Sequence, residues 1–360
     1  MDPALRQITD RIAAAASSGM PLRLRGGGSK DFYGGSPANE PAGEVLDTRP
    51  LSGITSYEPS ELVVTARAGT PLAELEALLA TRGQCLPFEP PSFGGAATVG
   101  GMVAAGLSGP ARASSGAVRD FVLGVTLVNG RAEVLSFGGQ VMKNVAGYDV
   151  SRLMVGSLGT LALIAEVSLK VLPVPPAECT LRFAMDEAQA ITQLNRWAGR
   201  PLPLNASCWQ GGMLWLRLRG AQAAVASARQ VLGGERVDDA QTPWQSLREQ
   251  SHDFFRIGGD ECLWRMSVPD TAPPLGMGDT LLEWGGAQRW LRRPATGLAE
   301  VRQAATRAGG HATLFRAASG APRHAVFTPL AEPLARIHTA LKQQFDPHGI
   351  FGRDRLYAGF

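Results

Sequence analysis

The sequence has 360 residues, of which 44% are hydrophobic and 19% are charged, and its formal net charge is +3. This length is enough for about two or three ordinary domains, and the composition is that of a globular protein, which excludes disordered and fibrous classes. The basic residues are scattered without a dense Lys/Arg block, so we expect no nucleic-acid partner. No apolar run approaches the roughly 20 residues of a membrane-spanning helix.

The sequence lacks the motifs of several common kinds of metal, nucleotide and catalytic site. The four cysteines have no C-x-x-C spacing and the five histidines form no close pair, so we expect free thiols and no metal site. The chain contains neither a G-x-x-x-x-G-K-[ST] loop nor a G-x-S-x-G elbow, which argues against P-loop enzymes and serine hydrolases. After Gly26 and Gly28, Asp31 stands where a nicotinamide-binding G-x-G-x-x-G motif needs its third glycine.

The first residues predict a helix, a strand and a glycine loop. Residues 6–18 have helical spacing up to Gly19, and residues 21–25 alternate apolar and basic side chains as a strand does. Acidic residues occur early, so we expect an amphipathic helix rather than a secretory signal, and a protein that is cytoplasmic or peripheral at the inner membrane face. The loop that follows either presents bare backbone N–H groups to an anionic ligand or is an ordinary tight turn; it consists of Gly26, Gly27, Gly28 and Ser29.

Two strands and a helix come next. Residues 44–51 and 62–68 predict the strands. Thr70 is the expected N-cap of the helix, and Pro71 stands at its first position, where a missing N–H costs nothing. The helix ends at Gly83, and we expect its apolar face in the core; this face is formed by Leu72, Leu75, Leu78 and Leu79.

The run of residues 90–128 is almost uncharged and is built from Gly, Ala and Ser, ending in an apolar segment, 122–128, that predicts a buried strand. Such a run is either a flexible linker or a place where backbone approaches a ligand closely. The ordered flanks favour the second interpretation. Glycine pairs at 94–95 and 100–101 remove Cβ atoms, so we expect their N–H groups to be free for a ligand.

A third glycine-rich passage covers residues 138–172. It contains a short cluster of Lys143, Asn144, Tyr148 and Asp149, then a glycine-punctuated turn and a predicted strand, 161–171. The chain therefore has three glycine-rich loops beside strands within its first 172 residues. Three such loops in one half of a chain indicate backbone segments that converge on one large ligand with anionic and planar parts, such as a dinucleotide.

Prolines at 173, 175 and 176 predict a domain boundary, and the next segment has the order βαββαβ, which is the ferredoxin-like pattern. Residues 243–316 predict a rougher repeat of the same order: a helix at 243–255, a strand at 262–268, a hairpin at 280–291, a helix at 298–308 and a strand at 311–316. A final helix at 331–345 precedes the tail FDPHGIFGRDRLYAGF.

The three loops, RGGGSKDFYG, PPSFGGAATVGGMVAAGLSGPARASSGAVRDFVLGV and MKNVAGYDVSRLMVGSLGTLALI, resemble the FAD domain of the vanillyl-alcohol oxidase family, also called the PCMH type. The segment FDPHGIF resembles that family's C-terminal return to the flavin. The resemblance implies an α+β fold in three parts: a two-subdomain PCMH-type FAD-binding domain over 1–173, an α+β cap domain with the ferredoxin-like pattern over 174–330, and a helix and tail over 331–360 that return to the FAD domain.

The resemblance also implies roles for individual residues. The FAD pyrophosphate is expected against Gly26, Gly27, Gly28 and Ser29, and the phosphates and ribityl chain beside Thr98, Val99, Gly100 and Gly101. The flavin end is expected beside Ser108, Gly109 and Gly116, and the adenosine side beside Gly159 and the backbone of Ile164. Arg25 and Pro90 complete the expected cofactor-binding set. The resemblance identifies no catalytic residue.

Three departures from the family pattern affect the predicted chemistry. Ser29 and Lys30 occupy the place where some members carry a flavin-linking histidine, so we expect non-covalent FAD. Residues 258–260 are the nearest match to an H-x-G-D-G-N-x-H metal motif and lack both histidines. The tail has residues 352–355 where the family has N-P-G-[RK], which leaves Arg355 or His348 as residues that could face the flavin.

Within the family, the short chain and the segment KNVAGYDVSRLMVGSLGTL resemble the FAD-binding subunits of bacterial glycolate dehydrogenase complexes. The implied function is oxidation of glycolate, a 2-hydroxy acid, with electrons passed through flavin to an iron–sulfur partner. The expected partners are a homologous flavoprotein subunit and that iron–sulfur subunit, and membrane association is expected only through them. Two alternatives are a structural or electron-relay flavoprotein subunit of the same complex and a free-standing FAD-dependent alcohol or hydroxy-acid oxidase.

Overall fold

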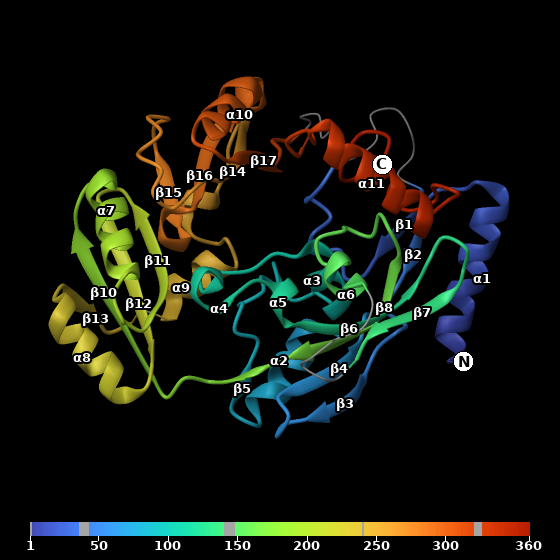
Figure 1. The fold of residues 1–360 in the computed structure, drawn as a ribbon, viewed down its shortest axis with the longest axis horizontal. Helices are drawn as coiled ribbons and strands as arrows, with labels where there is room; N and C mark the ends of the chain where they lie inside the picture. Colours follow the sequence, from blue (N-terminus) through green and yellow to red (C-terminus); the bar gives the residue numbers. More distant parts are fainter. Residues whose placement is uncertain (1, 36–42, 140–147, 240, 320–325) are drawn as a thin grey trace.

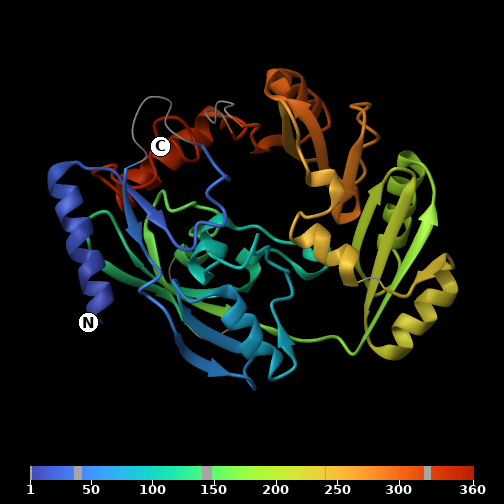
Figure 2. The same ribbon diagram turned by 180° about the vertical axis from the view of Figure 1, so that it is seen from behind.

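The computed structural model describes residues 2–35, 43–139, 148–239, 241–319 and 326–360. The described chain forms two large sheets, one of five strands and one of eight, and two small sheets of two strands each. The five-stranded sheet and the first helix lie at one end of the molecule, and the eight-stranded sheet lies at the other (Figures 1 and 2). The predicted mixed α+β class is confirmed. Within the described residues, no helix has both the length and the apolarity needed to cross a bilayer.

The N-terminal helix α1 (Pro3–Ser18) leads into β1 (Leu22–Arg25), which pairs in parallel with β2 (Glu44–Asp47). Asp2 caps α1 by accepting hydrogen bonds from the backbone N–H groups of Ala4 and Leu5. The helix ends at Gly19, whose φ of 71° is a conformation that favours glycine. The tail reaches this unit, since Leu22 and Phe351 form an isolated parallel bridge.

The five-stranded sheet has the order β3-β4-β8-β6-β7, with all neighbours antiparallel. Its strands are β3 (Ile54–Glu58), β4 (Val63–Arg67), β6 (Val122–Val128), β7 (Val134–Gly138) and β8 (Leu163–Lys170). Two helices, α2 (Leu72–Ala80) and α3 (Val99–Ala105), pack their buried side chains into the core of this sheet. The remaining elements here are short: β5 (Gln84–Cys85), which pairs with β9 (Leu172–Pro173), and α4 (Arg112–Ser115), α5 (Val118–Phe121) and α6 (Val150–Leu153).

Three local predictions in this part are wrong. Thr70 does not cap α2, because its hydroxyl instead accepts from the N–H and donates to the carbonyl of Gly53, and Pro71 takes the N-cap position. The helix also ends at Ala80, before Gly83. In the central run, residues 99–105 form α3 rather than irregular loop. Leu72, Leu75 and Leu79 are fully buried as expected.

The eight-stranded sheet contains two repeats of one strand order. Its strands run β13-β10-β12-β11-β15-β16-β14-β17. When each half is read from its outer edge to the middle of the sheet, its four strands stand in the order fourth, first, third, second. The first half comprises β10 (Ala177–Ala184), α7 (Glu187–Ala198), β11 (Leu204–Gln210), β12 (Met213–Gly220), α8 (Gln222–Leu232) and β13 (Glu235–Val237). The second comprises β14 (Glu261–Ser267), β15 (Thr280–Glu283), β16 (Gln288–Pro294), α10 (Leu298–Arg307) and β17 (His311–Arg316). The ferredoxin-like pattern and its rougher repeat are confirmed, and the second half lacks the first helix.

The two faces of the eight-stranded sheet have different neighbours. One face packs against α7 and α8 in the first half and against α10 in the second. The other face packs against α9 (Gln241–Arg248), the short 3-10 turn Asp253–Phe255 and three residues of the N-terminal half, Tyr33, Ala105 and Leu107. The eight-stranded sheet therefore has an apolar contact with the first loop, α3 and the central run. The predicted domain boundary falls between β9 and β10, in different sheets, and the domain limits remain predictions.

Polar contacts reinforce the junction between the sheets. The carboxylate of Glu249, just after α9, accepts hydrogen bonds from the Ser92 hydroxyl at 2.7 Å and from the backbone N–H of Phe93 at 2.8 Å. On β12, Arg217 forms a buried ion pair with Glu89 at 2.6 Å. Ser92 and Phe93 stand at the start of the central run and Glu89 just before it, so this loop is held against the half of the chain that contains the eight-stranded sheet.

The last helix, α11 (Glu332–Phe345), is fixed through a buried lysine. The Lys342 ammonium donates to the Thr160 carbonyl at 2.7 Å, to the Asp346 carboxylate at 2.8 Å and to the Phe351 carbonyl at 2.7 Å. Asp346 also accepts from the backbone N–H groups of Ile350 and Phe351. Burial lowers the pKa of Lys342, and the Asp346 carboxylate opposes that shift. The network joins α11, the tail and the third glycine-rich passage.

Replacement of Lys342 by methionine removes the cation and leaves Asp346 as a buried, unpaired carboxylate. We expect Lys342→Met to lower the free energy of unfolding by about 3–5 kcal/mol, as for other broken buried ion pairs. The matched control is Arg336→Met in the same helix, where the pair with Glu332 is exposed and the expected change is within about 0.5 kcal/mol. Denaturant unfolding of the full chain measures both, and equal losses for the two variants would contradict the assigned role of Lys342.

Candidate functional site

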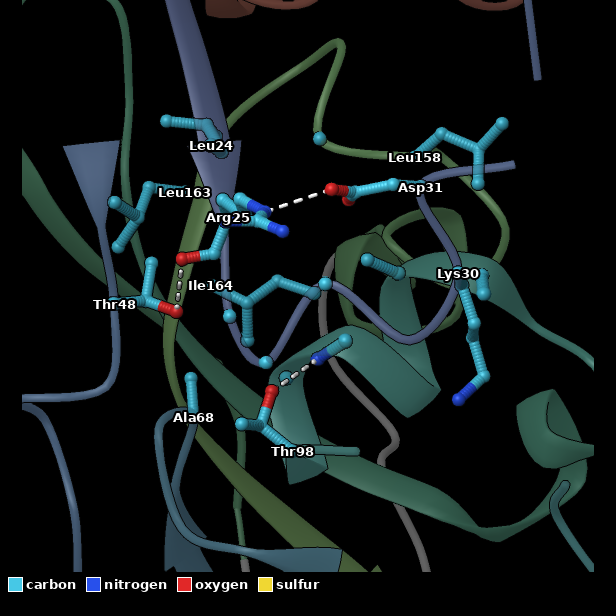
Figure 3. A pocket seen from close by; sticks show the side chains of 18 of the residues that line it. Leu24, Arg25, Lys30, Asp31, Thr48, Ala68, Thr98, Leu158, Leu163 and Ile164 are labelled. Atoms are coloured by element: carbon cyan, nitrogen blue, oxygen red, sulfur yellow. Dashed lines mark hydrogen bonds and ion pairs between the residues drawn. The ribbon is translucent and has the colours of Figure 1, made fainter. Parts of the chain in front are cut away.

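A cavity lies where the three glycine-rich segments meet, and we name it the loop cavity (Figure 3). The first loop contributes residues 24–31, the central run contributes Thr98 and part of α3, and the third passage contributes residues 158–159 and 162–164. Thr48, Ala68 and Arg355 complete its wall. The structure thus brings together segments that are separated by up to 330 residues in the chain, from the first loop to Arg355.

The first loop presents backbone donors to the loop cavity. Among the described residues, the N–H groups of Gly27, Gly28 and Ser29 donate to no protein acceptor. Gly28 has a φ of 75°, which lets the chain reverse directly after β1. The loop is stabilised at its base, where the Arg25 guanidinium donates to the Asp31 carboxylate at 2.7 Å (Figure 3). Several unused N–H groups in one turn form a concave site for an anion.

The glycines here allow loops to pack against one another. A Cβ atom on Gly27 would lie 1.4 Å from the Ala96 carbonyl oxygen, and one on Gly26 would lie 2.3 Å from the Thr98 hydroxyl oxygen. A Cβ on Gly100 would lie 2.5 Å from the Ala68 side chain. Close approach of backbone is therefore required, and the partner in the structure is the neighbouring protein segment, which shapes the cavity wall.

The donors of the central run are already used, so the expectation that they are free is wrong for Gly100 and Gly101. The N–H of Gly100 donates to the Ala68 carbonyl at 2.8 Å. The N–H of Gly101 donates at 3.2 Å to the hydroxyl of Thr98, which is the N-cap of α3 (Figure 3). The physical reason is that a helix begins at Val99, and its first N–H groups need acceptors.

The third passage closes the cavity from the other side. The N–H of Leu158 donates to the Ala104 carbonyl at 2.8 Å, which ties this passage to α3. Gly159 has a φ of 74°, and the chain then enters β8, placing Leu163 and Ile164 on the cavity wall. Apolar side chains on this side suit a planar, weakly polar group. Lys143 and Asn144 of the predicted cluster lie outside the described residues.

Lys30 is the cavity residue with the strongest electrostatic perturbation. Its side chain is buried, and in the described part of the chain its ammonium donates one side-chain hydrogen bond, to the Ser29 hydroxyl at 3.3 Å, and lies 5.4 Å from the centre of the Phe93 ring. Burial lowers the pKa of Lys30 to about 8, against the opposing influence of the Glu249 carboxylate. At neutral pH Lys30 therefore adds a buried positive charge to the wall of the loop cavity, on the side toward Glu249.

The structure places the predicted site residues in three groups. Ten line the loop cavity: Arg25, Gly26, Gly27, Gly28, Ser29, Thr98, Gly100, Gly101, Gly159 and Ile164. Pro90, Ser108 and Gly109 lie at the junction with the eight-stranded sheet, where the Pro90 carbonyl accepts from Arg248 and the Gly109 carbonyl accepts from Trp284. Val99 is buried in the core beneath the cavity, and Gly116 follows α4 outside it.

Sequence reasoning missed several cavity residues, chiefly Thr48, Ala68 and Leu158. Thr48 and Ala68 follow strands β2 and β4 and carry no motif, so only the strand ends could have indicated them. Arg355 lines the cavity and donates to the Tyr33 carbonyl at 3.0 Å, whereas His348 is exposed.

The arrangement fits a ligand with a phosphate part and a planar part. Backbone donors and Lys30 occupy one region of the loop cavity, and apolar residues of β8 occupy another. Among the described residues, no group of three His, Cys, Asp or Glu side chains could hold a metal ion. All four cysteines are free, as expected.

Comparisons with known proteins agree with this chemistry. Residues 5–138 match the family model described as FAD binding domain. The chain is 47% identical over 352 residues to the glycolate oxidase subunit GlcE of Escherichia coli (strain K12), covering 98% of this chain and 97% of that protein. It is 28% identical over 187 residues to the glycolate oxidase subunit GlcD of Bacillus subtilis (strain 168), covering 52% of this chain and 39% of that one.

The fold is shared with a solved structure of alkyldihydroxyacetonephosphate synthase, at a TM-score of 0.66 and 15% identity, covering 96% of this chain and 74% of that chain. The match to GlcE extends over nearly the full length of both proteins, across both sheets and the tail. The chain is therefore a homologue of the glycolate oxidase subunit GlcE and belongs to its family, within the FAD-binding oxidoreductases of the PCMH type.

Proposed function

We propose that this chain is the FAD-binding subunit of a glycolate oxidase complex that oxidises glycolate to glyoxylate. The observation that carries the proposal is the loop cavity, whose unused N–H groups and apolar wall suit FAD and whose first loop and central-run residues lie within the part of the chain that matches the FAD-binding family model. The GlcE relative is named as a glycolate oxidase subunit, which supports the substrate. When bound, FAD supplies the two-electron acceptor chemistry that the side chains lack.

The cavity residues would hold FAD and position it. The N–H groups of Gly27, Gly28 and Ser29 would bind the pyrophosphate, and Lys30 would add a positive charge. Residues Leu163 and Ile164 would line the adenosine side, while Ser108 and Gly109 would lie toward the flavin end. We propose non-covalent binding, because the lining of the loop cavity contains none of the His, Cys or Tyr side chains that form flavin links.

The proposed partners are a GlcD-like homologous flavoprotein subunit and an iron–sulfur subunit, which would receive electrons from the flavin. Association with the inner membrane face would come only through these partners. Affinity purification of the full chain from its native cell, followed by mass spectrometry, tests the assembly. Recovery of both partners supports it, whereas a chain recovered alone with glycolate-reducible flavin supports a free-standing oxidase.

The first prediction concerns the cofactor and its reduction. Purified chain is expected to carry FAD that passes entirely into the filtrate when the protein is denatured by acid and filtered. Anaerobic glycolate is expected to bleach the flavin absorption in the complex. Flavin retained by denatured protein would disprove non-covalent binding, and flavin in this chain that glycolate never bleaches, alone or in the complex, would favour the structural-subunit alternative.

The second prediction concerns Gly27. A methyl group at this position would meet the Ala96 carbonyl, so the first loop must move away from the central run. We expect Gly27→Ala to weaken FAD binding by more than about tenfold, which corresponds to about 1.4 kcal/mol. The matched control is Gly199→Ala, where the nearest atom lies 3.8 Å away, with FAD content measured by fluorescence and folding by circular dichroism. Unchanged FAD affinity in Gly27→Ala would refute the placement.

The third prediction follows from the lowered pKa of Lys30. Its cation is present below a pKa of about 8 and is lost above it. An anionic ligand such as FAD should therefore bind more weakly as the pH rises through that value, with a several-fold increase in Kd. In Lys30→Arg, whose charge persists, the Kd should stay flat over the same range. Parallel pH profiles of the two proteins, measured by flavin fluorescence, would count against this role for Lys30.

A further inference from the structure

A wide cleft lies between the N-terminal half of the chain and the eight-stranded sheet, and we name it the arginine cleft. The space within it measures about 1030 Å³, and its described lining has no residue in common with that of the loop cavity. Among the described lining residues, only Phe93 and Trp244 have apolar side chains. The name refers to its four arginines, Arg217, Arg219, Arg248 and Arg316.

The periodicity of the flanking elements explains why these side chains meet. Residues three or four positions apart lie on one face of a helix, and residues two apart lie on one face of a strand. On α9 this places Trp244, Gln245 and Arg248 along one wall of the cleft. On β12 it places Arg217 beside Arg219, and the Arg217 guanidinium lies 5.0 Å from the centre of the Trp244 ring. The opposite wall comes from α2 and the start of the central run.

Ion pairs across the cleft fix two of the guanidinium groups. Arg217 pairs with Glu89 at 2.6 Å. Arg248 pairs with Glu76 on α2 at 2.5 Å. Each pair joins the two halves of the chain, so these side chains are ordered before a ligand arrives. They therefore lose little conformational freedom when one binds.

The cleft nevertheless retains hydrogen-bond donors in excess of acceptors. Within the described chain, each arginine has one terminal nitrogen that forms no hydrogen bond: Nη1 of Arg217, Arg248 and Arg316, and Nη2 of Arg219. The carboxylate of Glu89, in contrast, is used at both oxygens, since one accepts from Arg217 and Arg219 and the other accepts from the Ala111 N–H at 3.0 Å. Unused guanidinium N–H groups suit a ligand that brings carboxylate oxygens.

Arg316 differs from the other three arginines. Its guanidinium donates to the side-chain oxygen of Gln250 at 3.1 Å and lies 4.6 Å from the centre of the Phe32 ring. In the part of the chain that the structure describes, no carboxylate forms an ion pair with it. The ring and the amide orient the guanidinium without neutralising its charge, so Arg316 can bind a carboxylate through two parallel hydrogen bonds.

The lining favours a polypeptide ligand over a small molecule. Small-molecule pockets are lined mainly by apolar side chains and measure roughly 300–1,000 Å³, so this cleft is more polar than such pockets and stands at the upper limit of their size. Protein interfaces are enriched in arginine and tryptophan and depleted in lysine, and their strongest contacts often come from the first two. The described lining has four arginines and Trp244, and it contains no lysine.

We propose that the arginine cleft receives an acidic segment of a partner subunit, whose carboxylates lie against Arg316 and the unused terminal nitrogens of Arg219 and Arg248. This inference rests on the assembly in the proposed function and adds a docking site to it. The side chains of Gln241 and Gln245, both exposed on α9, meet the backbone of the segment. The contact is electrostatic, so its affinity falls as the ionic strength rises.

Occupancy of the cleft is tested by cysteine labelling. Gln245→Cys places a thiol at the exposed mouth, and N-ethylmaleimide should modify it in the isolated, FAD-loaded chain. In the complex purified with its partner subunits, the labelling rate should fall at least about tenfold, because water is excluded from an interface core. Peptide mass spectrometry separates this thiol from the four native cysteines. The matched control is Gln222→Cys at the start of α8, on the other face of the sheet, which should label at one rate in both samples.

The charge preference is tested by two opposite substitutions at the same exposed position. Gln245→Glu should raise the Kd for the purified partner subunits about tenfold, because a like charge opposes an acidic segment, and Gln245→Lys should lower it several-fold. Both shifts should shrink at high salt. The same substitutions at Gln222 should leave the Kd unchanged, and biolayer interferometry with this chain immobilised measures all of them.

The outcomes separate this inference from the proposed function. Equal labelling of Gln245→Cys in the chain and the complex overturns the docking site, and so do equal effects of the glutamate and lysine substitutions. Citrate that protects Gln245→Cys as strongly as the partner subunits do would show a small-anion site instead. A chain that assembles with no partner also overturns the docking site, although glycolate bleaching of its flavin would still uphold the oxidation. Protection in a complex whose flavin glycolate never bleaches upholds the docking site and refutes glycolate oxidation.

Discussion

The buried ammonium of Lys342 is the interaction on which the cofactor half depends. Its three acceptors belong to the third glycine-rich passage, to the residue that ends α11 and to the tail, so one side chain joins these segments to α11. Phe351 then bridges to Leu22 on the strand that leads into the first glycine loop. The tail thereby contacts β1 directly and the third passage through Lys342, and both segments contribute residues to the loop cavity. This explains why a helix near the end of the chain returns to its beginning.

A second constraint comes from the start of the central run. Glu89, just before the run, pairs with Arg217, and Glu249, just after α9, accepts hydrogen bonds from Ser92 and Phe93. Positive φ angles at Glu89 and Phe93, 48° and 51°, show that the backbone here adopts conformations that nearby contacts must stabilise. The start of the central run is consequently held by two separate contacts to the second half of the chain.

Sequence periodicity was sufficient to predict the elements whose pattern of apolar side chains reflects which of them are buried. Strands β6 and β17 begin and end at the predicted residues, and the two repeats were visible from the order of their elements. Predictions from local motifs were wrong where contacts with distant residues replace the local hydrogen bonds that the motif implies. Thr70 bonds to Gly53, 17 residues away, instead of capping the next helix, and the glycines of α3 did not reveal that a helix forms there. The four arginines of the arginine cleft carry no motif, because they come from β12, α9 and β17, which only tertiary packing brings together.

The repeated strand order of the eight-stranded sheet has a further consequence. The face toward the glycine loops carries charged residues in both repeats, but their partners differ. In the first repeat Arg217 is neutralised by Glu89, so this copy serves as an anchor. In the second repeat Arg265 stays without a carboxylate among the described residues and faces a cavity. The two repeats therefore differ in their charged contacts on this face: Arg217 forms an ion pair, whereas Arg265 donates to the Tyr33 hydroxyl and lies over the Phe315 ring.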